Sequence, residues 1–327
     1  MDPVRAIADA VLYEGYILWP YRRSALKNRR RFTFGGVFPE AHSREHPDDA
    51  CVMRTECLLE GGPDVTVEAR VRFLQVVARR VARAAGGGEL ELVDELTVGG
   101  ERHVTWEEAV EREVAVATTP GAGPRGAPIA IPAGSDCEDL DGAGALLRSW
   151  HALDGAVEVA SVPLGDRLWR VEVTVSNTTP WAGGTRADAL EHAFCSTHAV
   201  LRAAGGGAFV SLADPPEALR AHAGACRNVG AWPVLVGEPG TADTVLASPI
   251  ILEDHPRVAP ESPGDLFDGG EIDQLLTLSI LSLTDEEKAE MRASDPRARE
   301  ILERTEALTP GELMRLHGTI RDWRVLR

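Results

Sequence analysis

The amino-acid sequence predicts an α/β protein of the α+β type, with a strand-rich, mostly antiparallel body, packed helices and a C-terminal helical module. Two observations predict this fold class. Segments in which apolar and polar residues alternate recur through the first 252 residues, and a period of two is typical of half-buried strands. Helix start signals are concentrated after residue 253. A chain of 327 residues can bury one large core or two modest ones.

The first region, residues 1–119, is expected to consist mainly of strands. A short helix over 4–14 precedes them, because its apolar residues fall on one stripe. Residues 51–59 and 65–73 are predicted to be strands, and the turn Gly61-Gly62-Pro63-Asp64 predicts a hairpin between them. Two further strands are predicted over 90–98 and 110–118, with a helix as the alternative for the second.

The Pro- and Gly-rich segment 120–134 is predicted to be a loop. It precedes a second α/β region, residues 135–252, which is either separate or continuous with the first. Residues 168–175 are the firmest strand prediction, since apolar residues alternate with Arg, Glu and Thr, whereas 187–203 are predicted to be helical. The other strands predicted here cover residues 208–212, 232–236 and 245–252.

The third region, residues 253–327, is predicted to be a small helical module. Its first helix covers the apolar segment 272–283. Thr284 and Glu287 have the spacing of a capping box, so they predict the start of a second helix. Asp295-Pro296 is a start signal for a third helix. A second capping box, at Thr309, predicts a last helix that reaches about residue 323.

Composition excludes several classes of function. A net charge of −17 argues against general nucleic-acid binding, which needs a basic surface. Neither of the two lysines, Lys27 and Lys288, follows a glycine, so a P-loop nucleotide site is excluded. No apolar run reaches the ~18 residues of a membrane span. The N-terminus lacks the order of a secretory signal, so we expect a cytoplasmic protein.

The N-terminal segment Leu12–Pro39 concentrates aromatic and basic residues. It holds all three tyrosines and has six cations between Arg22 and Arg31. Interfaces are enriched in such side chains, which combine large contact area with a polar group. A solvated face that balances acidic surface elsewhere and a nucleic-acid site are the alternatives for the cations. We predict a partner-binding surface formed by Tyr16, Trp19, Tyr21, Arg22, Arg23, Lys27, Asn28 and Arg30.

A second hypothesis is a metal-dependent or hydrolytic enzyme centred on His192, Cys195 and His198. On the predicted helix 187–203, neighbouring members of this set could share a zinc or nickel ion, although all three converge less well. The alternative is a core cysteine with hydrogen-bonded or solvent-facing histidines. Ser196 beside His198 also permits a hydrolase, but no nucleophile-elbow motif is present.

Five segments together resemble a family of uncharacterised actinobacterial proteins that are encoded beside NiFe-hydrogenase genes. They are Leu12–Pro39, Thr55–Gly61, Phe209–Leu219, Asn228–Glu238 and Ser248–Lys288. The resemblance implies a role in hydrogenase assembly, maturation or complex structure, with a hydrogenase subunit or maturation factor as partner. Since no convincing catalytic set is present, we expect a non-enzymatic accessory, assembly or scaffold protein of such a redox enzyme, without a cofactor.

Overall fold

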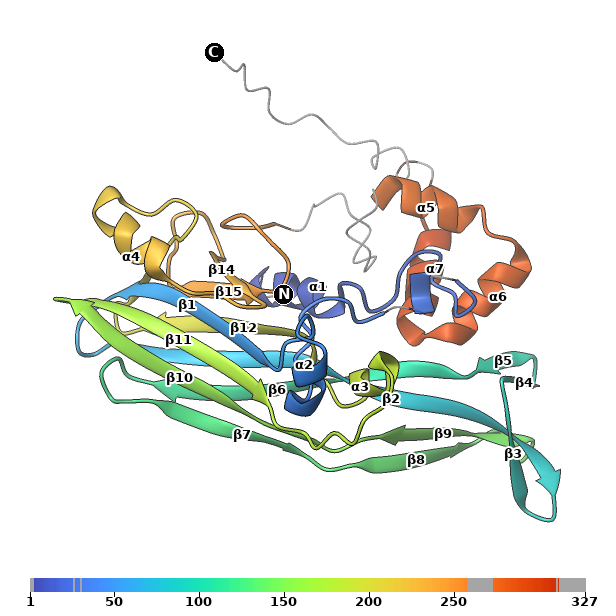
Figure 1. Ribbon diagram of the computed structural model, residues 1–327. Helices are drawn as coiled ribbons and strands as arrows, with labels where there is room; N and C mark the ends of the chain where they lie inside the picture. Colours follow the sequence, from blue (N-terminus) through green and yellow to red (C-terminus); the bar gives the residue numbers. More distant parts are fainter. Residues whose placement is uncertain (1–2, 26, 30, 258–272, 310, 312–327) are drawn as a thin grey trace.

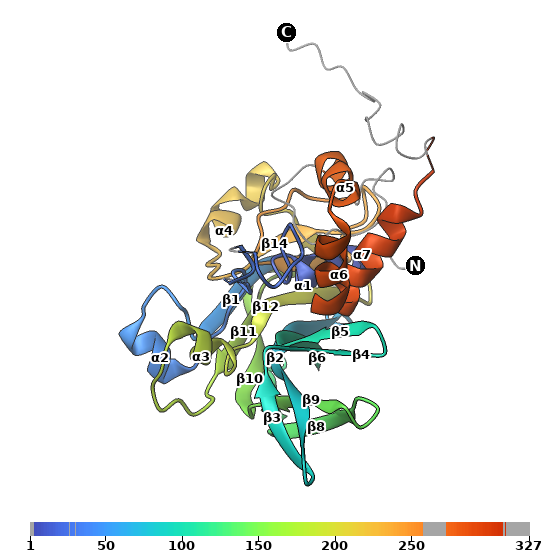
Figure 2. The ribbon, with the colours of Figure 1, turned by 90° about the vertical axis from the view of Figure 1, so that its right-hand side faces the viewer.

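A computed structural model describes residues 3–25, 27–29, 31–257, 273–309 and 311 (Figure 1). These residues form an α+β fold, as the sequence predicts, and all the strand pairs within its sheets are antiparallel. Two large sheets lie against each other, and the helices α5, α6 and α7 cluster over one side of them, toward one end (Figures 1 and 2).

The first sheet has the order β13-β1-β11-β10-β7, with strands Ala208–Val210, Val52–Glu60, Leu168–Asn177, Leu153–Gly165 and Arg125–Ile131. The second follows the path β14-β15-β12-β2-β9-β8, with strands Trp232–Leu235, Thr244–Ser248, Cys195–Ala204, Thr66–Gly86, Gly144–Trp150 and Gly134–Asp139. The strands β3 (Glu89–Val93) and β6 (Trp106–Thr118) also pair with β2. A separate hairpin joins β4 (Glu95–Val98) and β5 (Glu101–Val104).

The main core lies between the two sheets. Val173 and Val175 of β11 belong to the same buried cluster as Val71 and Phe73 of β2. Burial along β11 alternates, which confirms the strand predicted over 168–175. Strand formation in both sheets is therefore stabilised by apolar side chains that are removed from water on one shared face.

The strands β1 and β2 do not form the predicted hairpin. β1 pairs with β11 and β13 in the first sheet, whereas β2 pairs within the second. The turn over 61–64 therefore carries the chain from one sheet to the other. A tight turn between two alternating segments can form a hairpin within one sheet or a crossing between two sheets. The local sequence is the same in both cases and could not distinguish them.

The two predicted strand-rich regions, 1–119 and 135–252, are interleaved. β1 pairs with β11 from Val52↔Ser176 to Glu60↔Leu168, and β2 pairs with β12 in the other sheet. Each sheet thus contains strands of both regions. The expected loop 120–134 is partly wrong, because it contains β7, which pairs with β10 at the edge of its sheet. Pro128 is tolerated there, because an edge strand does not need every N–H for pairing.

The predicted helix over 187–203 is also wrong. Only Arg186–Leu190 are helical (α3), behind a capping box formed by Thr185 and Asp188. Cys195–Ala204 form β12, which lies between β2 and β15. Its first seven residues are all buried. A strand that is buried on both faces has no polar-apolar alternation, so periodicity misassigned it.

The helices at the two ends of the described chain agree with the sequence. The apolar stripe of α1 (Pro3–Tyr13) packs on β12, β14 and β15 through Val4, Ile7 and Val11. In the C-terminal module, α5 covers Asp273–Leu281, α6 covers Asp285–Ser294 behind the predicted Thr284–Glu287 capping box, and α7 covers Pro296–Glu306. The helix predicted from Thr309 to about residue 323 lies mostly outside the described residues.

The remaining helices are short. They are α2 (Glu40–Glu45), α4 (Arg220–Ala225) and the 3-10 helices Lys27–Arg29 and Glu217–Leu219. The longest described helices, α1 and α7, have 11 residues each. A bilayer crossing needs ~20.

Candidate functional site

Residues 15–38, here called the N-terminal ribbon, run from α1 past the C-terminal helices (Figure 1). Tyr16, Tyr21 and Phe32 of the ribbon are buried in one cluster with residues of two other parts of the chain. Those residues are Leu74, Val76 and Trp106 of the second sheet, and Leu276, Ile280, Met291, Ile301 and Leu302 of α5, α6 and α7. The ribbon therefore joins the helical module to the sheet.

A buried hydrogen bond fixes the ribbon to the start of α7. The Tyr16 hydroxyl donates to Oδ2 of Asp295 at 2.6 Å. Oδ1 of Asp295 accepts from the backbone N–H of Arg297 at 2.8 Å and so caps α7. Burial, and next the negative charge of Asp295, raise the pKa of Tyr16 well above its ordinary value. Tyr16 is therefore a permanent donor at neutral pH, and it links the helix cap to the sheet cluster.

Arg31 is the second link between the ribbon and the sheet. Its side chain is only 2% exposed. Its guanidinium donates to the backbone oxygens of Tyr16 at 3.3 Å and of Glu107 at 2.7 Å, and to Oε2 of Glu107 at 3.2 Å. The guanidinium carbon also lies 3.8 Å from the ring centroid of Trp106, a cation–π contact. Arg31 is thus a structural residue of this chain.

These contacts correct the predicted partner-binding surface. Tyr16 is 1% exposed, Tyr21 0% and Asn28 7%, so a partner cannot reach them in this conformation. The Asn28 side chain bonds to the backbone of Leu18 and Arg22 and holds the ribbon's turn closed. Trp19 is partly buried against the same cluster. The enrichment in aromatic and arginine side chains therefore reflects packing inside the molecule at Tyr16, Tyr21 and Asn28, and not a partner-binding surface.

The basic residues of the predicted surface fall into three groups: ion-paired, exposed, and outside the described residues. Arg22 forms an ion pair with Glu287 of the helical module at 2.8 Å. Arg23 pairs at 3.2 Å with Asp94, whose side chain is 88% exposed. Lys27 is exposed, and Arg30 lies outside the described residues. Of the predicted set, Arg23 and Asn28 line the cleft that is described next.

The Tyr16 link can be tested by removing one atom. Tyr16→Phe is expected to lower the free energy of unfolding by about 2 kcal/mol, because the buried Asp295 carboxylate loses a hydrogen bond. Tyr13→Phe is the matched control. Its hydroxyl bonds to Glu111, which is 42% exposed and can turn to water. Urea unfolding measures both variants, and equal losses would contradict a special role for Tyr16.

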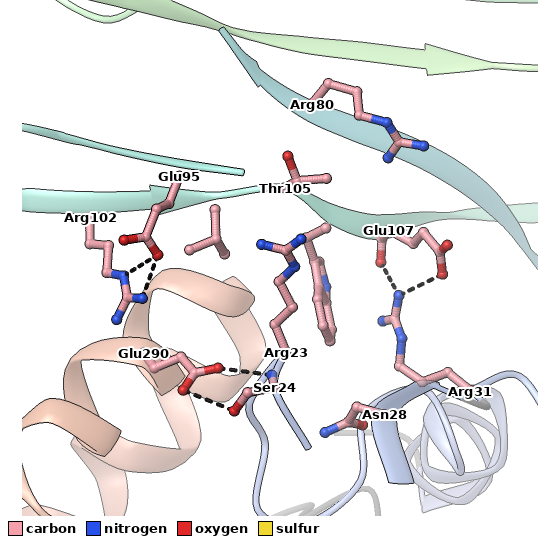
Figure 3. A pocket seen from close by; sticks show the side chains of 12 residues that line it. Arg23, Ser24, Asn28, Arg31, Arg80, Glu95, Arg102, Thr105, Glu107 and Glu290 are labelled. Carbon is pink, nitrogen blue, oxygen red and sulfur yellow. Dashed lines mark hydrogen bonds and ion pairs between the residues drawn. The ribbon is translucent and has the colours of Figure 1, made fainter. Parts of the chain in front are cut away.

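A polar cleft of about 530 Å³ lies where the ribbon, the β4–β5 hairpin, β6 and α6 meet (Figure 3). We call it the arginine cleft. Its lining residues are Arg23, Ser24, Asn28, Arg31, Arg80, Glu95, Arg102, Val104, Thr105, Trp106, Glu107 and Glu290. Four arginines and three glutamates thus face one space, so the cleft has a small cationic excess within a protein of net charge −17.

Most charges of the arginine cleft are already paired. Arg102 donates twice to Oε2 of Glu95, at 3.1 and 2.5 Å, and Arg31 holds Glu107. Glu290 accepts from the N–H and the hydroxyl of Ser24 at 2.9 and 3.1 Å. Arg80 differs from these residues. Its side chain is exposed and makes no hydrogen bond or ion pair with any residue that the structure describes (Figure 3).

Sequence reasoning did not find Arg80, Arg102 or Trp106. Arg80 lies on β2 and Arg102 on β5, where outward-facing arginines of strands are ordinary. No local spacing connects either of them with the ribbon. The signal in the sequence was the excess of cations at 22–31, within the aromatic-rich segment Leu12–Pro39, and it indicated only the wall of the cleft that the ribbon forms.

The structure does not assemble the predicted metal site from His192, Cys195 and His198. Within the described part of the chain, no group of three or more His, Cys, Asp or Glu side chains could hold a metal ion. His192 stacks on His151 with ring centroids 4.1 Å apart. Cys195 and His198 are each 0% exposed in β12. The physical reason is that Cys195 and His198 lie on the strand β12 and not on the predicted helix, where neighbouring members could have shared an ion, and that His192 lies outside this strand.

Burial also sets the chemistry of these side chains. It raises the pKa of the Cys195 thiol to about 12, so the reactive thiolate is absent at neutral pH. It lowers the pKa of His198 to about 4. Nδ1 of His198 lies 3.0 Å from the backbone oxygen of Ser196, while Nε2 has no hydrogen-bond partner among the described residues. The Ser196 hydroxyl has no such partner in the described part of the chain either, so the two side chains are not hydrogen-bonded as a nucleophile and its base.

Comparison with known proteins gives no family. No protein-family model and no curated protein matches the chain. Among solved structures, it is similar to the InvG secretin domain β-barrel from the Salmonella SPI-1 injectisome NC-base, with 12% identity and a TM-score of 0.13. The match covers 52% of this chain, and the chain spans about half, 51%, of the InvG chain. A likeness at this TM-score supports no conclusion about fold or function.

Proposed function

We propose that this protein is a non-enzymatic accessory, assembly or scaffold protein of a NiFe hydrogenase or a similar redox enzyme, and that it binds a partner protein at the arginine cleft. The observation that carries the proposal is Arg80, whose guanidinium has no partner among the described residues, in a cleft assembled from three distant parts of the chain. Unpaired arginines at such a junction suit recognition of a carboxylate. The association with a hydrogenase rests on the family resemblance of the five segments.

A cytoplasmic location and a protein partner, not nucleic acid, belong to the same proposal. The net charge of −17 supports it, because the phosphate backbone of nucleic acid would be repelled outside the cleft. The burial of Cys195 and His198 favours binding over the enzymatic alternative, since neither side chain can meet a substrate without opening the core.

Co-purification tests the proposal. The full-length chain, tagged and produced at its natural level in the organism that encodes it, is isolated at low salt, and bound proteins are identified by mass spectrometry. We expect a hydrogenase subunit or a maturation factor in stoichiometric amount, released at high salt because exposed charge pairs are screened. A preparation that never retains a redox-enzyme subunit or a maturation factor would overturn the proposal.

A further inference from the structure

We infer that the arginine cleft receives an extended segment of the partner polypeptide with one isolated acidic side chain, whose carboxylate pairs with Arg80. This inference rests on the proposed function, because it names the chemistry of the partner at the same cleft. Three features of the lining lead to it: the predominance of polar and charged residues, the Arg80 guanidinium without a partner among the described residues, and the three fixed carboxylates that line the same space.

The lining favours a polypeptide over a small organic ligand. Pockets for small molecules are lined mainly by apolar and aromatic side chains. Here ten of the twelve lining residues are polar or charged, and the other two, Val104 and Trp106, are 2% and 5% exposed. A small ligand would gain little from apolar contact. An extended peptide brings its own backbone donors and acceptors, which a polar lining can satisfy.

Arg80 selects the charge of the segment. A guanidinium can bind a carboxylate through two parallel hydrogen bonds, and its planar shape makes this pairing specific. Arg102 and Arg31 are held by Glu95 and Glu107, so using them would break existing ion pairs. Arg80 has no such cost among the described contacts. The first carboxylate to enter therefore binds at Arg80.

The fixed glutamates limit the segment to a single acid. Glu95, Glu107 and Glu290 line the same space as Arg80. Glu290 is held by Ser24 hydrogen bonds, which leave its negative charge in place. A second acidic residue beside the first would meet these carboxylates and be repelled, whereas neutral or basic neighbours would not. The cleft thus discriminates an isolated acid from an acidic tract.

Peptide titration followed by NMR tests the inference on the full-length protein. The probe is an acetylated and amidated octapeptide of Ser and Asn with one central Glu, compared with its Gln analogue, with an analogue that has three consecutive Glu, and with inorganic phosphate. We expect saturable shifts of the Arg80 Nε–Hε signal with the single-Glu peptide only. The Arg80→Gln variant is expected to raise the dissociation constant by about tenfold or more.

The matched control is Arg125→Gln. Arg125 is an exposed arginine of the other sheet, on β7, whose side chain likewise makes no hydrogen bond or ion pair with a described residue. It should leave binding unchanged, and both variants should keep the wild-type backbone spectrum. Equal binding by Arg80→Gln, tighter binding of the three-Glu peptide, or phosphate binding as tight as the peptide would each overturn the inference.

The two proposals fail separately. A retained redox-enzyme subunit together with no peptide binding would place the docking site outside the arginine cleft. Peptide binding at Arg80 without any redox partner in the co-purification would support the inference about the cleft and contradict the proposed function.

Discussion

Replacing Arg31 with alanine is expected to lower the free energy of unfolding by about 3 kcal/mol. The variant loses three hydrogen bonds and the contact with the Trp106 ring, and leaves the backbone oxygens of Tyr16 and Glu107 without this donor. Arg31 joins the ribbon to the sheet, and Tyr16 links the ribbon to the start of α7, so the loss should appear in one cooperative transition. Urea unfolding monitored by circular dichroism measures it.

Two controls separate geometry from charge. Arg31→Lys keeps the charge but loses the planar stacking and the forked donors, so more than half of the loss should remain. Arg125→Ala removes an exposed arginine without a described partner and should change stability by less than about 0.5 kcal/mol. If Arg31→Ala behaves like Arg125→Ala, the ribbon is not held as the structure describes.

Acid is expected to destabilise the protein through His198. Burial lowers the pKa of His198 in the folded state from 6.5 to about 4. Between these two values the unfolded chain binds a proton that the folded protein excludes, so stability falls as pH falls through this window and is retained above it. The contribution lost by pH 4 is about 3 kcal/mol.

The measurement compares the pH dependence of unfolding in the wild type and in His198→Gln, which cannot titrate. The wild type should lose about 3 kcal/mol more than the variant between pH 7 and pH 4, whatever the stability of the variant at pH 7. The imidazole signals of His198 should stay those of the neutral ring above pH 5 in an NMR titration. Parallel pH profiles would contradict a buried, neutral His198.

The sequence predicted the elements whose burial is one-sided. The stripe of α1, the alternation in β11 and the capping box at Thr284 each depend on neighbours within a few residues, and all three are present. It misassigned β12, whose burial on both faces removes the alternation. The sequence also predicted a hairpin between β1 and β2, which lie in different sheets, because the residues of a turn do not determine which sheet the next strand joins.

The arginine cleft could be predicted only in part for the same reason. Arg23 and Asn28 were found because the ribbon concentrates cations and aromatics. Arg80 and Arg102 reach the cleft through the pairing of β2 and the β4–β5 hairpin, a long-range arrangement without a local signature. Conversely, the H-x-x-C-x-x-H spacing of His192, Cys195 and His198 is easily recognised but forms no shared site, because Cys195 and His198 lie on a strand and not on the predicted helix.

Charge reversal at Arg80 tests the central claim most directly. Tagged wild type, Arg80→Glu and Arg125→Glu are compared for the amount of redox-enzyme subunit or maturation factor that each retains from the native host at low salt. The account predicts that Arg80→Glu loses the partner, while Arg125→Glu retains it at the wild-type level, since both side chains are exposed but only Arg80 lines the cleft. Equal retention by the two variants would contradict binding at the arginine cleft.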